Sequence, residues 1–223
     1  MALALFDLDN TLLAGDSDYL WGVFLSEKGV VDRDTYEREN ERFYEEYKEG
    51  RLDIMEFLTF SLRPLAENDP AQLHAWREEF LREKIDPILT EDARLLVEMH
   101  RKRGDTLAVI TATNAFVTAP IVERFGVPNL IATEPEMAEG RYTGRVRGIP
   151  CFREGKVKRL KAWLAGRDES LENAWFYSDS HNDLPLLELV SHPMPVDPDP
   201  ALETVAAEKG WPVLYLHKDA PPP

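Results

Sequence analysis

The stretch "ALALFDLDNT", Ala2–Thr11, joins an apolar run to two aspartates. The apolar part is typical of a strand that is buried on both faces. Asp7 and Asp9 follow it directly, and residues two apart on a strand point to the same side. Two carboxylates so close together repel each other unless a cation lies between them or one is protonated. The pair therefore indicates a cation site or a reactive group, or else a surface turn that the two side chains merely cap.

Short apolar runs of the same kind recur along the chain and predict further strands at Thr106–Ile110, Asn129–Ala132, Ala174–Tyr177, Pro195–Val196 and Pro212–Leu216. Helical spacing of apolar residues lies between them, at Glu91–Arg103, Phe116–Phe125 and Lys156–Leu164. Strands that alternate with helices predict an α/β fold with a doubly wound, Rossmann-like parallel sheet. In such sheets ligands bind at the carboxyl ends of the strands, where Asp7 and Asp9 are expected.

The first strand is not followed by a simple crossover helix. Residues 16–85 are helical in pattern and strongly charged, as in "YERENERFYEEYK", Tyr36–Lys48. We expect an inserted helical subdomain at residues 16–85 and a core domain formed by residues 1–15 and 86–223. The acidic run within the insertion is explained most simply as a solvated helix face.

Composition limits the partners and the compartment. The 223 residues carry 26 basic and 41 acidic side chains, a net charge of −15, which argues against nucleic acid or an anionic membrane as partner. Cys151 is the one cysteine, so an internal disulfide is impossible and a reducing compartment fits. No apolar stretch reaches the roughly 18 residues that span a bilayer, and no signal-like segment opens the chain. We expect a cytoplasmic protein.

A second acidic cluster follows the predicted strand Ala174–Tyr177, in "YSDSHNDLPLL", Tyr177–Leu187. Asp179 and Asp183 are therefore expected on the same edge of the sheet as Asp7 and Asp9. Several carboxylates at one edge suit a hard cation with oxygen ligands, and Mg²⁺ is favoured because it needs few protein ligands and works with phosphates.

Two further segments could bind an anion. "LAVITAT" ends a strand at Thr111, and a hydroxyl with free N–H groups before a helix can hold a phosphate. Lys156 begins a basic helix in "CFREGKVKRLKAW", where Lys158 and Lys161 are alternatives to it. Any one of these lysines could equally be an ordinary surface residue.

These segments together resemble the haloacid dehalogenase (HAD) superfamily of phosphotransferases. "DLDNT" is similar to its DxDxT signature, Thr111 to its second motif, Lys156 to its third and "SDSHND" to its fourth. The helical insertion resembles the C1 cap of the subfamily that contains phosphoserine phosphatases and certain bacterial histidinol-phosphate phosphatases. Four motifs in this order cover nearly the whole chain, so the resemblance predicts a phosphoric monoester hydrolase.

The resemblance also implies a role for each motif residue. Asp7 would attack phosphorus and form an aspartyl-phosphate, and Asp9 would act as general acid and base. Mg²⁺ would bind the Asp7 carboxylate, the Asp9 main-chain carbonyl and Asp179, with Asp183 orienting these ligands. The residues expected to contact the phosphate are Thr111, Ala112, Lys156 and Asn182.

The substrate is expected to be a small phosphate monoester chosen by the cap. Asp16 stands nine positions after Asp7, where phosphoserine phosphatases carry a glutamate for the substrate amine, although Asp16 could simply cap a helix. Ser61 occupies the position of their carboxylate-binding arginine, and Arg63 lies close enough to replace it. The expected order is histidinol phosphate, then phosphoserine, then a broad range of small phosphates. A HAD-fold binding module without turnover is the alternative from another class.

Overall fold

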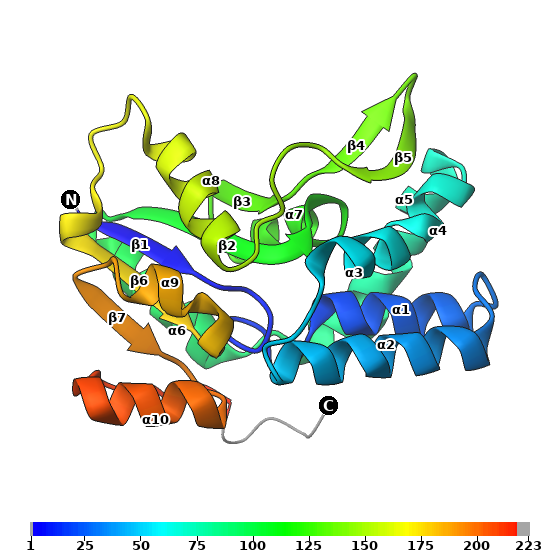
Figure 1. Ribbon diagram of the computed structural model, residues 1–223. Coiled ribbons are helices and arrows are strands. Elements are labelled where there is room, and N and C mark those ends of the chain that lie inside the picture. The colour runs from blue at the N-terminus through cyan, green and yellow to red at the C-terminus, as the bar shows by residue number, and fades with distance from the viewer. Residues whose placement is uncertain (1, 218–223) are drawn as a thin grey trace.

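The computed structural model describes residues 2–217, and its centre is a five-stranded parallel sheet (Figure 1). The strands lie in the order β3-β2-β1-β6-β7, with the bounds Leu3–Phe6 (β1), Thr106–Asn114 (β2), Asn129–Thr133 (β3), Ala174–Ser178 (β6) and His192–Pro195 (β7). From β1 the chain builds outward to β3 and then crosses to β6 on the other side. This reversal beside β1 confirms the doubly wound α/β prediction and places a ligand crevice at the carboxyl ends of β1 and β6.

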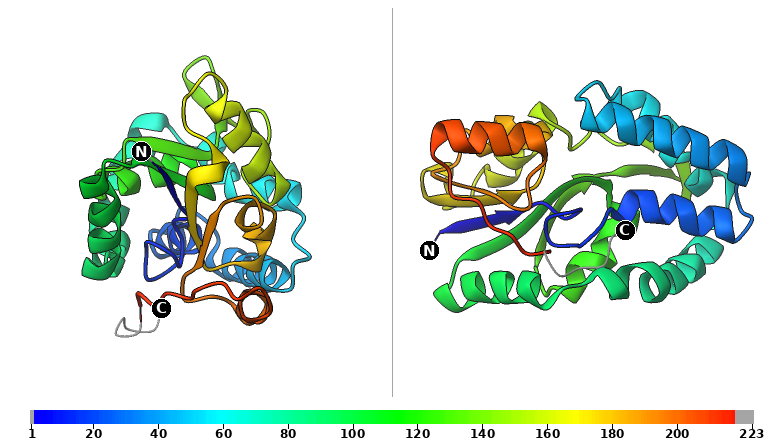
Figure 2. Two further views of the ribbon diagram at one scale, coloured as in Figure 1. Left: turned by 90° about the vertical axis from the view of Figure 1, so that its left-hand side faces the viewer. Right: turned by 90° about the horizontal axis from the view of Figure 1, so that it is seen from below.

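Helices cover both faces of the sheet (Figure 2). Ala4 and Phe6 of β1 pack in one apolar cluster with α6 (Glu91–Arg103) and α7 (Ala115–Arg124). Leu3 and Leu5 point the opposite way and pack with α8 (Glu154–Leu164), α9 (Leu184–Leu187) and α10 (Pro200–Lys209). The central strand is therefore buried on both faces, as its continuous apolar run predicts.

The core helices lie close to their predicted positions. α6 begins after Thr90, whose hydroxyl accepts a hydrogen bond from Ala93 N–H, and it ends at Gly104 with φ of 75°. α7 starts one residue earlier than expected because Asn114 caps it by accepting from Val117 N–H at 3.2 Å.

The inserted segment forms five helices at one end of the sheet (Figure 1). Their bounds are Ser17–Glu27 (α1), Arg33–Lys48 (α2), Ile54–Ser61 (α3), Arg63–Glu67 (α4) and Pro70–Phe80 (α5). Aspartate side chains cap the starts of α1, α2, α3 and α5. The chain then returns to the core through a π-helical turn, Leu81–Ile85, and a 3₁₀ turn, Asp86–Ile88. Residues 16–85 remain our proposed cap.

The base of this cap is joined to the core by aromatic contacts. The Trp21 ring of α1 packs edge-to-face on Phe80 of α5 and on Phe116 of α7, with centroids 5.2 and 5.9 Å apart. All three rings belong to the apolar cluster that also contains Phe6 of the central strand. Cap and core therefore share one hydrophobic interior.

Four features differ from expectation. The strand predicted at Pro195–Val196 is instead β7, which begins at His192 and ends before Val196, and the strand predicted to end at Thr111 continues to Asn114. A hairpin of β4 (Pro135–Ala138) and β5 (Arg141–Val146) packs on α4, and the sequence analysis did not predict it. The strand predicted at Pro212–Leu216 is wrong, because only Leu214 forms a bridge there, with Val196. The remaining described elements are short 3₁₀ turns at Leu171–Asn173 and His181–Asp183. None of the described helices could cross a membrane by its length and apolarity.

Candidate active site

The loop after β1 fixes the first aspartate of the DLDNT segment. Asp7 N–H extends the β1–β6 ladder by donating to the Tyr177 carbonyl at 2.8 Å. Its own carboxylate accepts a hydrogen bond from Leu8 N–H at 2.9 Å. Asn10 then adopts a left-handed φ of 55°, and the N–H groups of Leu12 and Leu13 both return to the Leu8 carbonyl. The chain turns sharply and leaves the Asp7 side chain at the strand end, only 6% exposed.

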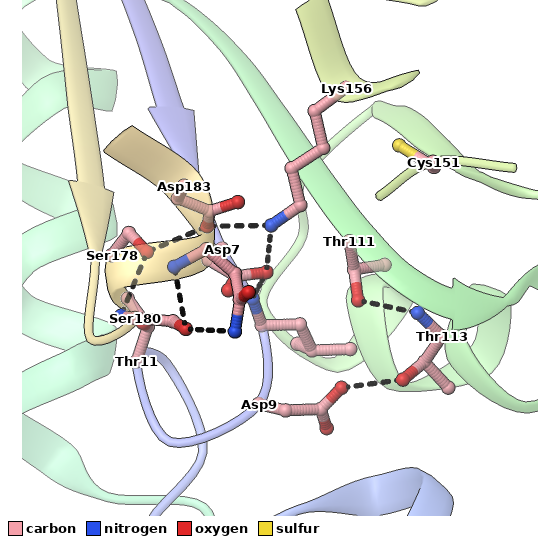
Figure 3. Close-up of polar contacts among 12 residues, drawn as sticks. Asp7, Asp9, Thr11, Thr111, Thr113, Cys151, Lys156, Ser178, Ser180 and Asp183 are labelled. Atoms are coloured by element: carbon pink, nitrogen blue, oxygen red, sulfur yellow. Dashed lines mark hydrogen bonds and ion pairs between the residues drawn. The ribbon is translucent and has the colours of Figure 1, made fainter. Parts of the chain in front are cut away.

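Lys156 ties two of the aspartates together (Figure 3). Its Nζ lies 3.1 Å from Asp7 Oδ1 and 2.7 Å from Asp183 Oδ2. Asp183 Oδ2 also accepts a hydrogen bond from Ser178 Oγ at 2.7 Å. Lys156 is 3% exposed, so this is a buried ion-pair triad. Of the three candidate lysines, Lys156 is the one brought to the aspartates, while Lys158 and Lys161 are exposed.

Asp179 is held by the first loop. Thr11 Oγ1 donates to Asp179 Oδ1 at 3.1 Å, and it accepts from Asp179 N–H at 3.0 Å. The hydroxyl of the DLDNT threonine thus links the loop after β1 to the loop after β6. This contact places the Asp179 carboxylate at the same strand ends as Asp7.

Asp9 faces a different neighbourhood. Its Oδ1 accepts from Ser17 N–H at 2.7 Å, and its Oδ2 accepts from Thr113 Oγ1 at 2.8 Å (Figure 3). Ser17 is the first residue of cap helix α1, and Thr113 belongs to β2. The second aspartate is therefore oriented jointly by cap and core.

The charges at this edge are unbalanced. Burial raises the pKa of Asp7 well above its usual value; Lys156 opposes the rise, and Asp183 and Asp9 add to it. Burial, followed by the charges of Asp7 and Asp183, raises the pKa of Asp179 in the same way. Burial also opposes the charge of Lys156, but Asp183 and Asp7 together raise its pKa. Four carboxylates here share one ammonium, an arrangement that an added cation would stabilise.

The donor set fits a magnesium ion. Asp7 and Asp179 offer carboxylate oxygens from adjacent strands, and hard oxygen ligands are those Mg²⁺ prefers. Within residues 2–217, no three acidic, histidine or cysteine side chains converge on a common cation position. The expected set consists of two carboxylates and the Asp9 main-chain carbonyl, and it stays a prediction.

The middle of β2 supplies an irregular stretch of backbone beside the aspartates. The register with β3 shifts between Ile110 and Asn114, and Thr113 N–H donates to Thr111 Oγ1 at 3.2 Å. Thr111 and Ala112 lie within β2, which runs on to Asn114, so the prediction that the strand ends at Thr111, just before a helix, is wrong. Both line the cavity next to Asp9.

This cavity, of about 80 Å³, lies between the strand ends and the cap. Its core side contains Asp7, Asp9, Lys156, Asn182 and Asp183. Its cap side is largely aromatic and apolar. The aromatic and apolar residues there are Tyr19, Phe43, Tyr44, Tyr47, Leu52, Ile54 and Phe57. Lys156 is the only cationic side chain among its described lining residues.

The two proposed specificity residues fare differently. Asp16 lines the cavity and also caps α1, because its Oδ1 accepts from the N–H groups of Asp18 and Tyr19 at 2.9 Å. Arg63 is exposed at the start of α4, lies 3.9 Å from Glu67 and is absent from the described lining of the cavity. The structure therefore brings Asp16, but not Arg63, to the site.

Other residues at the site were not singled out by sequence reasoning. Asp18 lines the cavity beside Asp16 and accepts a long hydrogen bond, 3.4 Å, from Asn114 Nδ2. The repeated acid in "DSD" was its only signal. Arg153 bonds to Asn182 Oδ1 at 2.9 Å, and no motif marked it. The aromatic residues on the cap side of the cavity could not be predicted from the sequence, because their position depends on how α2 and α3 face the core.

The fold and this arrangement of strand-end aspartates, lysine and hydroxyls define the class of protein. Residues 4–188 match the haloacid dehalogenase-like hydrolase family, and the chain belongs to it. The chain is 49% identical over 216 residues to the histidinol-phosphatase of Neisseria meningitidis serogroup C (strain 8013), covering 95% of this chain and 97% of that one. It is 31% identical to phosphoserine phosphatase SerB1 of Mycobacterium tuberculosis (strain ATCC 25618 / H37Rv), covering 94% and 69%. It is a phosphatase.

Solved structures agree with the fold. A crystal structure of a protein with unknown function from Bordetella pertussis Tohama I superposes with a TM-score of 0.90 at 49% identity, covering 96% of this chain and 98% of that one. A substrate-bound phosphoserine phosphatase superposes with a TM-score of 0.71 at 21% identity, covering 96% and 92%. The second likeness shows the shared fold alone.

Proposed function

We propose that this phosphatase is Mg²⁺-dependent and works through an aspartyl-phosphate on Asp7. The observation that carries this proposal is the position of Asp7: buried at the end of the central strand, in the cavity, with Lys156 Nζ at 3.1 Å. Lys156 holds the nucleophile in place and offers a positive charge to the incoming phosphate. A carboxylate oxygen of Asp7 attacks phosphorus as the bond from phosphorus to the leaving oxygen breaks.

Asp9 supplies and recovers the proton. Burial raises its pKa, and hydrogen bonds from Ser17 and Thr113 oppose that rise; a raised pKa favours the protonated form that a general acid needs. Protonated Asp9 gives its proton to the leaving oxygen. Ionised Asp9 then takes a proton from the water that attacks phosphorus, which releases inorganic phosphate and restores Asp7. The N–H of Ser17, at the start of cap helix α1, holds the Asp9 carboxylate in place for both proton transfers.

The metal would be held by the carboxylates of Asp7 and Asp179 and the main-chain carbonyl of Asp9. When bound, it supplies positive charge that offsets the repulsion between the nucleophile and the phosphate. Asp183 keeps its contact with Lys156 and Ser178, so its part is to position the lysine. Thr111, Ala112 and Asn182, which line the same cavity, would contact the phosphate oxygens.

We further propose histidinol phosphate as the substrate. The cavity presents Asp16 and Asp18 near aromatic rings, and its one described cation, Lys156, is already paired with two aspartates. A substrate amine can pair with Asp16, whose Oδ2 is not used by the cap hydrogen bonds. The carboxylate of phosphoserine would meet negative charge instead. The Neisseria relative named histidinol-phosphatase supports the same order.

One set of assays tests these proposals. Wild-type protein should hydrolyse p-nitrophenyl phosphate only with Mg²⁺, and Asp7→Asn should remove this activity while the circular dichroism spectrum stays unchanged. BeF₃⁻ with Mg²⁺ should be found on the Asp7 carboxylate in a crystal. A fully active Asp7→Asn variant would refute the mechanism. Faster turnover of phosphoserine than of histidinol phosphate would refute the substrate alone.

A further inference from the structure

Arg153 stands out because its backbone conformation is unfavourable for its residue type. It immediately precedes α8, the helix that carries Lys156, and has φ of 49° and ψ of −122°. A side chain with a β-carbon rarely adopts a positive φ, and such strain persists only where the surroundings fix it. Glycine would fit this position without strain. The arginine side chain must therefore contribute something that glycine could not.

Its guanidinium joins the core to the cap. Arg153 Nε donates to Asn182 Oδ1 at 2.9 Å, and Nη2 donates to the carbonyl of Gly50, just after cap helix α2. The guanidinium also lies over the Phe152 ring, 4.9 Å from its centroid. The two hydrogen bonds diverge from one planar group, a geometry that lysine cannot reproduce.

The contact with Asn182 decides how that amide is oriented. Arginine can only donate, so it holds the amide oxygen toward itself and turns the NH₂ group away. Asn182 Nδ2 accordingly donates to Ser180 Oγ and to the Tyr47 carbonyl of α2, both at 3.2 Å. A phosphate oxygen needs an N–H donor rather than the amide oxygen, and both N–H bonds of this NH₂ group have an acceptor here. Phosphate therefore receives one of them by replacing Ser180 Oγ, while the bond to the Tyr47 carbonyl stays in place. Asn182 is 3% exposed and lines the cavity, whereas Arg153 is absent from the described lining.

We propose that Arg153 is a positioning residue, which presents the Asn182 NH₂ group to the phosphate and ties this amide to the end of cap helix α2. This inference rests on the proposed phosphatase function. Two core side chains, Arg153 and Asn182, bond to two cap carbonyls, those of Gly50 and Tyr47. Seating of this end of α2 and orientation of the phosphate-binding amide are therefore one event.

The test uses inorganic phosphate as probe, with Mg²⁺ present. Arg153→Gly removes the guanidinium but suits the backbone, so its melting temperature should stay within about 3 °C of wild type. Its affinity for phosphate, measured by product inhibition and by the phosphate-induced shift in melting temperature, should fall by about 10- to 100-fold. Arg153→Lys should recover little of this loss.

A matched control separates strain from function. Glu139 also has a positive φ, 50°, and is exposed in the turn of the β4–β5 hairpin. Glu139→Gly likewise replaces a residue of positive φ by glycine and should leave phosphate affinity unchanged. In an Asn182→Ala background the further loss from Arg153→Gly should shrink to less than about threefold, because residues that act through one another are not additive.

The outcomes are distinct. Phosphate affinity of Arg153→Gly within about twofold of wild type, or an equal loss with and without Asn182, would overturn the positioning role. If Arg153→Gly does not fold, wild-type phosphate affinity in Arg153→Lys would overturn it instead. If the wild type does not hydrolyse p-nitrophenyl phosphate, the proposed function is rejected. The phosphate-induced shift in melting temperature would still decide the role of Arg153.

Discussion

Replacing Lys156 by methionine should cost both activity and stability. Methionine keeps most of the side-chain volume but leaves Asp7 and Asp183, 6% and 3% exposed, without their shared cation. Removing one partner of a buried ion pair typically costs about 3–5 kcal/mol. For a chain of this size that is about 6–20 °C of melting temperature. The loss of a preorganised charge beside the phosphate should lower kcat by at least about 100-fold.

The assay compares variants on the same helix. Lys158→Met and Lys161→Met change exposed lysines and should alter stability by less than about 0.5 kcal/mol. Adding Asp183→Asn to Lys156→Met removes one uncompensated charge, so part of the lost stability should return while kcat stays low. Thermal and urea unfolding in EDTA measure the first quantity, and p-nitrophenyl phosphate hydrolysis measures the second. A Lys156→Met protein as stable as wild type, or a larger defect in Lys158→Met or Lys161→Met, would refute the assignment.

Four further predictions follow from contacts described above. Asp179→Asn should raise the Mg²⁺ concentration for half-maximal activity more than Asp183→Asn does, in a metal titration after EDTA treatment; the reverse order would show that Asp183 is the ligand. Burial and the charge of Asp9 raise the pKa of Asp16 to about 7, so its negative charge appears as pH rises through that value. The ratio of kcat/KM for histidinol phosphate to that for p-nitrophenyl phosphate should therefore increase from pH 6 to 8. Asp16→Asn, which can still cap α1, should remove this increase. Cys151 is fully buried, its thiol donates to the Ile131 carbonyl at 3.4 Å, and burial raises its pKa to about 12. Native enzyme should therefore resist iodoacetamide, and Cys151→Ser should keep most turnover. Loss of turnover in Cys151→Ser would show that the thiol has a chemical role. Gly155→Ala would place a β-carbon 2.1 Å from the Pro150 carbonyl oxygen. We expect the free energy of unfolding, measured in urea, to fall by about 2 kcal/mol or more, and activity to fall because the Lys156 helix is displaced. An unchanged urea midpoint would contradict this and show that the loop moves without cost.

The sequence predicts those parts of the fold whose signals are local. The bounds of α6 match because Thr90 and Gly104 mark its ends. The ends of β1, β3 and β6 were predicted to within one residue from apolar runs followed by polar residues. The hairpin escaped notice because β4 and β5 are short and largely half-buried or exposed, so neither shows a clear apolar face. Pro212–Leu216 is apolar and lies beside the end of β7, but within the described chain only Leu214 pairs there, by donating to the Pro195 carbonyl, and a single bridge does not make a strand.

The site divides in the same way. Asp7, Asp9, Thr111, Lys156 and Asp179 lie in motifs of fixed order, so the resemblance could name them. The residues on the cap side of the cavity were beyond reach because their direction depends on tertiary packing. Arg63 is two positions from the expected arginine site, but α4 turns it to solvent. Arg153 was hidden because strain in a backbone leaves no trace in composition.

The aromatic joint of Trp21, Phe80 and Phe116 bears on how enzymes of this kind can be recombined. A cap can be exchanged as a cassette only if its base is self-contained, and here Phe116 belongs to α7, outside residues 16–85. A chimera that replaces the insertion alone would bring foreign side chains against that ring. New specificity is reached more easily by point changes at Phe43 of α2, which faces the cavity and packs with Leu52 and Phe152 in a separate cluster. A substitution at Phe43 leaves the interior that cap and core share intact, whereas Phe57 of α3 also packs against that interior.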